Sequence, residues 1–395
     1  MAGVDQLIRD LLETATRSDD PADLINLACA GMLDLGLPLW RLSVGIQTID
    51  PTIRAVSYVW LRNEGLSRLT TPYVPGPDND EPYLRSPIYA LVRDEQTQRH
   101  WRLDRGEGCA DIPLLDELRA EGATSYFMHI VRFGGEIAAA VPGVAIAIAT
   151  DRPGGFTEGD LARFYAVMPA VGLASYRYML ARVSSAILGV YLGERTARRV
   201  LAGEVRRGTG RAIEAAILLA DLRGFTSLAG REPPARVVAW LDQHLEAVGE
   251  AVAAQDGEVL KFLGDGLLAV FPADETVTSD EACRRALTAA EQALAATTAL
   301  NADRRDKGEP ELAMDVVLHY GEVVYGNVGA ARRLDFTVIG PTVNEASRIE
   351  ALCAELGQHL LLSAPFASRC GRATTSLGRF ALRGCPGETE VVALT

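Results

Sequence analysis

The sequence lacks several features that mark specialised classes of protein. Its six cysteines form no CxxC pair and follow no regular spacing, which argues against a zinc site and against a disulfide framework. It has no uninterrupted apolar run of the roughly 20 residues that a membrane-spanning helix needs, because Phe164 to Leu192 is broken by Arg177 and Arg182. The first residues, MAGVDQLIRDLLE, lack the apolar segment of a signal peptide. These absences predict a reduced cytoplasmic protein without membrane insertion.

The sequence also lacks an excess of positive charge, since it has 39 Lys and Arg against 52 Asp and Glu. Its net charge is −13 and its pI is near 5.0, which argues against nucleic acid or an anionic membrane as the main partner. An acidic protein that acts on an anionic substrate must bring metal ions or local Lys and Arg side chains to it. With 395 residues and 48% hydrophobic content, the chain is long enough for two domains.

Residues 1–157 mix helical and strand patterns in the order of an α+β sensor fold. Apolar residues follow helical spacing in two segments up to Leu35, with a stop and restart at Asp19 to Pro21. Alternating patterns predict strands, and a further helix is expected near Leu114. The polar segment 71–111 is expected to be irregular. The predicted strands cover 39–48, 54–61, 126–131 and 144–150.

The end of this region, RPGGFTEGDLARFYAVMPAVGLASY, resembles the last strand, turn and exit helix of a GAF domain. Domains of that type bind cyclic nucleotides, chromophores or small metabolites, or only dimerise. The sequence does not choose among these roles. We therefore expect residues 1–157 to be a GAF-like sensor domain with an unknown small ligand or signalling partner.

Residues 158–205 are predicted to form a helical linker, as one long helix or two consecutive helices. Pro169 lies early in it, and Gly189 and Gly193 lie near a possible break. Such a helix can pack on its own domain or act as a dimerisation helix between two domains. The second interpretation is favoured because a catalytic region begins directly after it.

Residues 206–395 predict a ferredoxin-like βαββαβ domain. An apolar run over 213–221 is typical of a strand buried on both faces. A helix follows Pro233-Pro234, two strands pair across the turn at Gly264 to Gly266, and a second helix over 280–300 leads to a strand over 314–319.

Two aspartates stand at the ends of strands in this region. Asp221 ends the first apolar strand, and Asp265 follows 44 residues later (265 − 221) in a Gly-Asp-Gly turn. Two carboxylates at such turns, one of them followed by Gly224, can hold a metal ion against a phosphate. The pair predicts divalent-metal chemistry on a nucleotide.

Four motifs carry a family resemblance: LADLRGFTSL, KFLGDGLLAVF, LHYGEVVYGNVG and DFTVIGPTVNEASRIE occur in this order. Over 206–395 the chain resembles the class III nucleotidyl cyclases. The resemblance implies a homodimer with active sites shared at its interface. It also implies that Asp221, Asp265 and the backbone carbonyl of Leu222 hold two Mg²⁺ or Mn²⁺ ions.

The same resemblance assigns the phosphates of the substrate to backbone and side-chain donors. The N–H groups of Gly224, Phe225 and Thr226 would meet the β- and γ-phosphates. Arg383 stands where the family often has a lysine that reaches the triphosphate; an exposed loop arginine is the alternative.

The resemblance assigns the base to Lys261 and Thr337. Lysine can donate to adenine N1, whereas guanine N1 carries a proton, so Lys261 favours ATP. Threonine at 337 is typical of the subgroup similar to bicarbonate-responsive soluble adenylyl cyclases, and its hydroxyl can accept from the adenine amino group. Asp335 is two positions away and is expected to be structural.

Asn344 and Arg348 match the NxxxR element of the family, with a spacing of four that places both on one helix face. Asn344 would orient the ribose, and Arg348 would stabilise charge in the transition state. His319 and Tyr320 are expected to be packing residues. In the family, the metal aspartates come from one subunit and the lysine, threonine, asparagine and arginine from the other.

The predicted function is an adenylyl cyclase that converts ATP to cyclic AMP and pyrophosphate under control of the N-terminal domain. Two alternatives remain open. The first is a guanylyl or mixed-specificity cyclase, since threonine reads a base less strictly than the aspartate of many adenylyl cyclases. The second is a catalytically silent nucleotide-binding signalling module.

Overall fold

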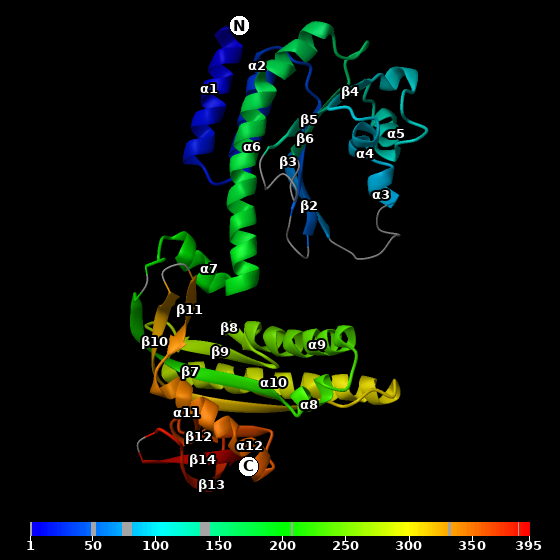
Figure 1. Ribbon diagram of the computed structural model, residues 1–395. Coiled ribbons are helices and arrows are strands. Elements are labelled where there is room, and N and C mark those ends of the chain that lie inside the picture. Colours follow the sequence, from blue (N-terminus) through cyan, green and yellow to red (C-terminus); the bar gives the residue numbers. More distant parts are fainter. Residues whose placement is uncertain are drawn as a thin grey trace. The chain divides into compact units, whose positions relative to one another are not determined.

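The structure is a computed structural model that describes residues 2–48, 53–72, 81–134, 143–206, 208–330, 333–385 and 387–395. The chain divides into two compact units, Met1–Ile187 and Leu188–Thr395 (Figure 1). The division falls inside the segment predicted as the helical linker. In the described part of the chain, no helix is both long enough and apolar enough to span a membrane.

The N-terminal unit is an antiparallel six-stranded sheet with helices on both faces, in the strand order β3-β2-β1-β6-β5-β4. Its helices are α1 (Ala2–Arg17), α2 (Pro21–Asp34), α3 (Glu81–Leu84), α4 (Pro87–Arg93), α5 (Pro113–Ala120) and α6 (Glu158–Leu192), with a short 3₁₀ turn at Leu103–Arg105. Its strands are β1 (Arg41–Gln47), β2 (Ile53–Leu61), β3 (Gly65–Pro72), β4 (Gln98–Trp101), β5 (Ser125–Arg132) and β6 (Gly143–Thr150).

Each face of this sheet has its own apolar core. Helices α1, α2 and α6 bury one face, with Phe164 of α6 packed edge-on against Phe127 of β5. Helices α4 and α5 bury the other face around Trp101 and Tyr126. This two-layered covering agrees with the predicted α+β class.

The predicted first two helices and four strands of this unit are confirmed. The expectation of irregular structure over 71–111 is wrong in part, because α4 and β4 lie within it and β3 ends at its start. Residues 73–80 of that segment lie outside the described residues. Strand β3 pairs with β2 but is almost entirely exposed, so it lacks the apolar alternation that would reveal it.

The predicted linker contains two consecutive helices. Helix α6 ends at Leu192, and α7 (Glu194–Leu201) begins after Gly193, whose φ of 83° favours glycine. Helix α6 continues through Pro169, which lies on an exposed side of the helix.

The C-terminal unit contains the predicted βαββαβ core. Its sheet order, β13-β14-β12-β10-β7-β9-β8, contains the ferredoxin-like order β10-β7-β9-β8, and β11 pairs with β10. The strands are β7 (Gly210–Arg223), β8 (Glu258–Leu263), β9 (Gly266–Ala273), β10 (Ala313–Ala330), β11 (Arg333–Ile339), β12 (Leu360–Ser363), β13 (Thr374–Ala381) and β14 (Glu388–Leu394). The helices are α8 (Phe225–Ala229), α9 (Pro234–Ala253), α10 (Ser279–Asp306), α11 (Pro341–Glu350), α12 (Leu352–Leu356) and α13 (Ala364–Ala367).

Strand β7 is buried on both faces, as its apolar sequence predicts. Its even-numbered residues, such as Leu218, pack in a core with α9 and α10. Its odd-numbered residues, such as Ile217 and Leu219, pack in a second core with α11 and α12. By the same alternation, Asp221 lies on the α11 face of the sheet.

A buried carboxylate fixes α7 to this unit. Glu258, the first residue of β8, accepts hydrogen bonds from the backbone N–H and the hydroxyl of Thr196, both at 2.8 Å. It also accepts one from the Tyr325 hydroxyl at 2.7 Å. Arg199 of α7 stacks over the Tyr325 ring, 4.8 Å from its centroid. Helix α7 therefore packs as part of the C-terminal unit.

Candidate active site

Of the two predicted metal aspartates, Asp221 lies near the end of β7 and Asp265 lies in the turn that leads into the neighbouring strand β9. In the antiparallel register of β7 and β9, Ala220 pairs with Leu267, so Asp221 lies beside Gly266 and the turn residue Asp265 lies beside Leu222. A Cβ atom on Gly266 would stand 2.6 Å from Asp221 Oδ1, so only glycine fits there. The Gly-Asp-Gly turn thus brings the two carboxylates together.

The carboxyl group of Asp221 is in an unfavourable environment for a negative charge. Burial, followed by the charges of Asp265, Glu350 and Asp315, raises its pKa to about 6. Asp315 is paired with Arg223 at 2.7 Å and with His359 at 2.8 Å, so much of its charge is balanced. Glu350 has no such partner among the described residues. A cation beside Asp221 would relieve this repulsion.

Glu350 is a site residue that sequence reasoning missed. It is the last residue of α11, is half-buried, and its pKa is raised by burial and by the charges of Asp315 and Asp265. Its position is set by the packing of α11 on β7 and β10, which no local pattern in the sequence shows. The NEASRIE motif did contain it.

The donor set fits a divalent cation that shares its coordination with a substrate. In the described part of the chain, no cluster of three or more His, Cys, Asp and Glu side chains is arranged to hold a metal ion. Mg²⁺ is usually held by one or two carboxylates together with substrate phosphates. Asp221 and Asp265 supply that number. The Leu222 side chain is buried, so only its backbone can contribute.

Backbone N–H groups are available directly after Asp221. Gly224 has a left-handed φ of 72° and precedes α8, whose first helical hydrogen bond runs from Leu228 N to Gly224 O at 3.2 Å. The N–H groups of residues 225–227 are therefore not used by the helix. The Phe225 side chain is buried in the core and anchors this loop, while Thr226 is exposed.

The two predicted base-reading residues lie on β8 and β11, which contact each other. Lys261 Nζ is 3.7 Å from Asp335 Oδ2, so Asp335 has an ion-pair partner that its sequence position did not reveal. Thr337 is two residues after Asp335 on β11, so both side chains lie on the same face of the sheet, and Thr337 is only 3% exposed. Its Oγ1 is buried without a hydrogen-bond partner in the described part of the chain, which is unusual for a buried hydroxyl.

Helix α11 carries Asn344 and Arg348 on one exposed face. Arg348 and Glu350 are separated by about 200° around the helix. Because Glu350 lies near Asp221 and Asp265, Arg348 points away from the carboxylates of its own chain.

Three other residues have distinct surroundings. His319 is buried, and burial lowers its pKa to about 4; Tyr320 donates to Ser279 at 2.6 Å. Both lie in the packed interior, as predicted. Arg383 is exposed after β13, at the opposite edge of the sheet from β8.

Residues 210–394 match the family of adenylate and guanylate cyclase catalytic domains. This part of the chain belongs to that family. It is similar to adenylate cyclase 1 of Rhizobium meliloti (strain 1021), with 35% identity over 159 residues, 40% of this chain and 23% of the relative. It is also similar to an adenylate cyclase of Anabaena cylindrica, with 33% identity over 37% of this chain and 29% of the relative.

Among solved structures, the adenylyl cyclase CyaB from P. aeruginosa is similar at 22% identity and a TM-score of 0.44. The similarity covers 47% of this chain and 96% of that one. The match spans less than a third of the length of the two curated relatives above.

The cyclase domain brings its predicted site residues into separate groups. Asp221 and Asp265 form one, and Lys261 and Thr337 form another. Within the described part of the chain, no hydrogen bond or ion pair joins the two groups. Asn344 and Arg348 form a third, exposed group on α11.

Proposed function

We propose that the protein is an adenylyl cyclase that converts ATP to 3′,5′-cyclic AMP and pyrophosphate. The observation that carries the proposal is that Asp221 lies beside the turn that carries Asp265 and shortly before the N–H groups of residues 225–227, which helix α8 does not use. Paired carboxylates beside unused N–H donors suit a triphosphate with its cations. The named adenylate cyclases among the relatives support the same reaction.

The residues have distinct tasks in this reaction. Asp221, Asp265 and the Leu222 carbonyl would hold two Mg²⁺ or Mn²⁺ ions, which lower the pKa of the ribose 3′-hydroxyl and offset the charge of the triphosphate. Gly224, Phe225 and Thr226 would donate N–H groups to the β- and γ-phosphates. The 3′-oxygen, once its proton has passed to water, would then bond to the α-phosphorus, the bond from the α-phosphorus to the oxygen that bridges to the β-phosphorus would break, and pyrophosphate would leave.

Preference for ATP would come from Lys261 and Thr337. Lys261 would donate to adenine N1, leaving its ion pair with Asp335, and Thr337 would accept from the adenine amino group. The partnerless Thr337 hydroxyl supports this role, because a substrate atom would satisfy it. The family includes guanylate cyclases, so the base preference needs its own test.

We propose that the active form is a homodimer with shared sites. Arg348 faces away from its own Asp221 and Asp265, and no hydrogen bond or ion pair among the described residues joins the base-reading pair to them. A second copy would supply Lys261, Thr337, Asn344 and Arg348 to these carboxylates. The stabilisation of transition-state charge by Arg348 would then depend on dimer geometry.

Helix α6 offers a surface for such a dimer. Leu173, Leu180 and Ile187 lie seven residues apart and are 59%, 39% and 39% exposed. A charged side chain nearby on α6 has its partner outside this surface, because Arg177 pairs with Asp19 at 2.7 Å. Apolar residues at heptad spacing are typical of a two-stranded coiled coil. We therefore assign this surface, the α6 seam, to the same helix of a second copy.

The N-terminal unit would regulate the cyclase domain as a GAF-like sensor. Its antiparallel sheet, covered by helices on both faces, is compatible with that role. Helix α7 follows α6 directly and is fixed to β8, the strand that carries Lys261. A change in α6 could thus alter a base-reading strand.

Turnover of ATP and GTP by the purified full chain with Mn²⁺ tests the proposal. We expect cyclic AMP to form faster than cyclic GMP. Asp221→Ala should abolish turnover, whereas Asp242→Asn, which removes an exposed carboxylate on α9, should not. Faster turnover of GTP would refute the base preference. Nucleotide binding without any cyclic product would refute the reaction and indicate a silent binding module.

A further inference from the structure

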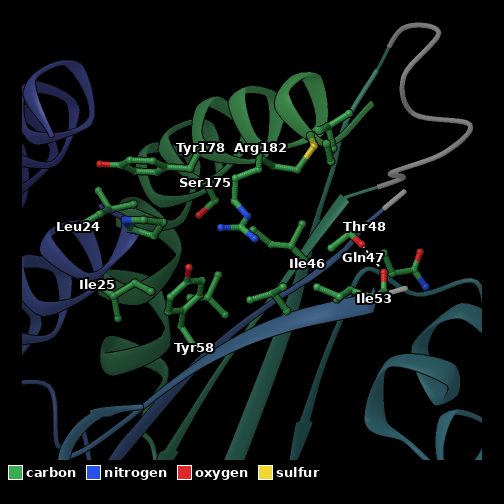
Figure 2. A pocket seen from close by; sticks show the side chains of 16 residues that line it. Leu24, Ile25, Ile46, Gln47, Thr48, Ile53, Tyr58, Ser175, Tyr178 and Arg182 are labelled. Atoms are coloured by element: carbon green, nitrogen blue, oxygen red, sulfur yellow. Dashed lines mark hydrogen bonds between the residues drawn. The ribbon is translucent and has the colours of Figure 1, made fainter. Parts of the chain in front are cut away.

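A small cavity lies in the N-terminal unit between the sheet and helices α2 and α6 (Figure 2). Its volume is about 60 Å³. Its walls are aliphatic and come from all three elements: Leu24, Ile25, Val44, Val56, Met179 and Val183. These walls belong to the packed core, so the cavity is a fixed feature of this unit.

Three polar groups without partners converge on this cavity. Ser175 is 4% exposed and Tyr58 is 8% exposed, and the hydroxyl of neither makes a hydrogen bond with a described residue. Figure 2 shows both hydroxyls and the Arg182 guanidinium pointing toward the same space, whereas the Tyr178 hydroxyl points away from it. Two hydroxyls and a guanidinium that face one apolar cavity are the kind of convergent polar groups that orient a ligand.

Among the described residues that line the cavity itself, Arg182 is the only charged side chain. The mouth adjoins a shallow depression that also contains Asp19 and Asp20. Asp19 is paired with Arg177 at 2.7 Å, and Asp20 accepts the Ala22 N–H at 2.9 Å as the cap of α2. Arg182 has no ion pair with any residue that the structure describes. An anionic ligand is therefore favoured.

We propose that this cavity binds a short aliphatic monocarboxylate. The carboxylate would accept hydrogen bonds from Arg182, Tyr58 and Ser175, and the alkyl chain would fill the aliphatic interior. A single water needs about 10–15 Å³ by the same measure, so the cavity has room for an alkyl chain of about four carbon atoms. Aliphatic walls with a guanidinium at the mouth match the two parts of such an acid.

Isothermal titration of the full chain with sodium salts from acetate to octanoate tests the proposal without any cyclase assay. Each added methylene should tighten binding about fourfold until the cavity is full, after which the gain should stop. The matching primary amides should bind at least about tenfold more weakly, because charge-assisted hydrogen bonds are lost. Binding of no acid, or equal binding of acids and amides, would overturn the proposal.

Variants locate the site. Arg182→Gln should weaken binding about tenfold or more, and Arg182→Lys by less. Arg68→Gln is the matched control, because Arg68 lines only the adjoining depression and binding should be unchanged. Ala186→Leu, which fills the cavity from its rim, should shift the optimum to a shorter chain. Melting curves of each variant verify folding.

The same experiments detect binding of the acid at a different cavity. A larger cavity on the opposite face of the sheet is lined by Arg132, Phe133 and Tyr83. Loss of binding in Arg132→Gln with unchanged binding in Arg182→Gln would assign the acid to that cavity and overturn the proposal. Unchanged chain-length preference in Ala186→Leu would also contradict it.

Discussion

Replacing Glu258 by alanine removes an acceptor that ties α7 to the cyclase domain. Its carboxylate accepts two hydrogen bonds from Thr196 and one from Tyr325, at 2.7–2.8 Å, and burial with the nearby Glu258 charge raises the pKa of Tyr325 to about 12. The substitution therefore leaves three donors without this acceptor in a buried site.

The expected loss follows from these groups. Each buried donor without a partner costs about 1–3 kcal/mol. The two hydroxyls lie 3.4 Å apart and can satisfy each other in part. Removal of a buried charge also returns some desolvation free energy. The net loss should be about 3 kcal/mol, which corresponds to a fall in melting temperature of about 6–12 °C for a unit of this size.

Thermal unfolding and limited proteolysis of the full chain measure both consequences. Glu258→Ala should melt earlier, and α7 should be cleaved faster than in the wild type. Glu258→Gln keeps one acceptor and should lose less. The matched control Glu250→Ala removes an exposed carboxylate on α9 and should change neither measurement. An unchanged melting temperature together with unchanged cleavage in Glu258→Ala would refute the assigned role of this carboxylate.

Three further perturbations have definite expected outcomes. Burial and the charge of Arg304 lower the pKa of His244 to about 4, so the folded state binds fewer protons than the unfolded state between pH 6.5 and 4. The free energy of unfolding should therefore fall by about 2 kcal/mol from pH 7 to pH 5. Urea unfolding at both pH values measures this loss, and His244→Gln should remove this part of the shift in the urea midpoint. Thr337→Val should raise the KM for ATP about fivefold while leaving stability equal or higher, because its hydroxyl has no partner in the described structure; an unchanged KM would contradict base reading. Replacing Leu173, Leu180 and Ile187 of the α6 seam by glutamate should weaken the dimer in sedimentation experiments, and an unaltered dimer would exclude that seam.

The sequence predicted those parts of the fold that depend on local signals. The βαββαβ core was predictable because β7 is continuously apolar and because Pro and Gly mark the ends of α9 and the β8–β9 turn. The β8–β9 hairpin places Asp265 at its turn, and the pairing of β7 with β9 brings Asp221 beside it. Strand β3 and the short β4 were not predictable, because their stability comes from pairing with β2 and β5 and not from an apolar pattern.

The contacts that depend on tertiary packing could not be predicted from local patterns in the sequence. Glu350 approaches Asp221 only because α11 folds back on β7, and Asp335 meets Lys261 only because β11 reaches β8. Glu258 begins β8, but its hydrogen bonds to Thr196 cross 62 residues of sequence. Arg383 is exposed, and its contact with the triphosphate stays a prediction.

The shared active site is tested most directly by mixing two inactive variants. Asp221→Ala removes a proposed metal ligand, and Arg348→Ala removes the proposed transition-state group that would come from the other subunit. If sites are shared, half of the dimers in an equal mixture are mixed and each has one intact site, so about a quarter of the wild-type turnover should return. A mixture as inactive as either variant alone, with mixed dimers present, would contradict a site built from two subunits.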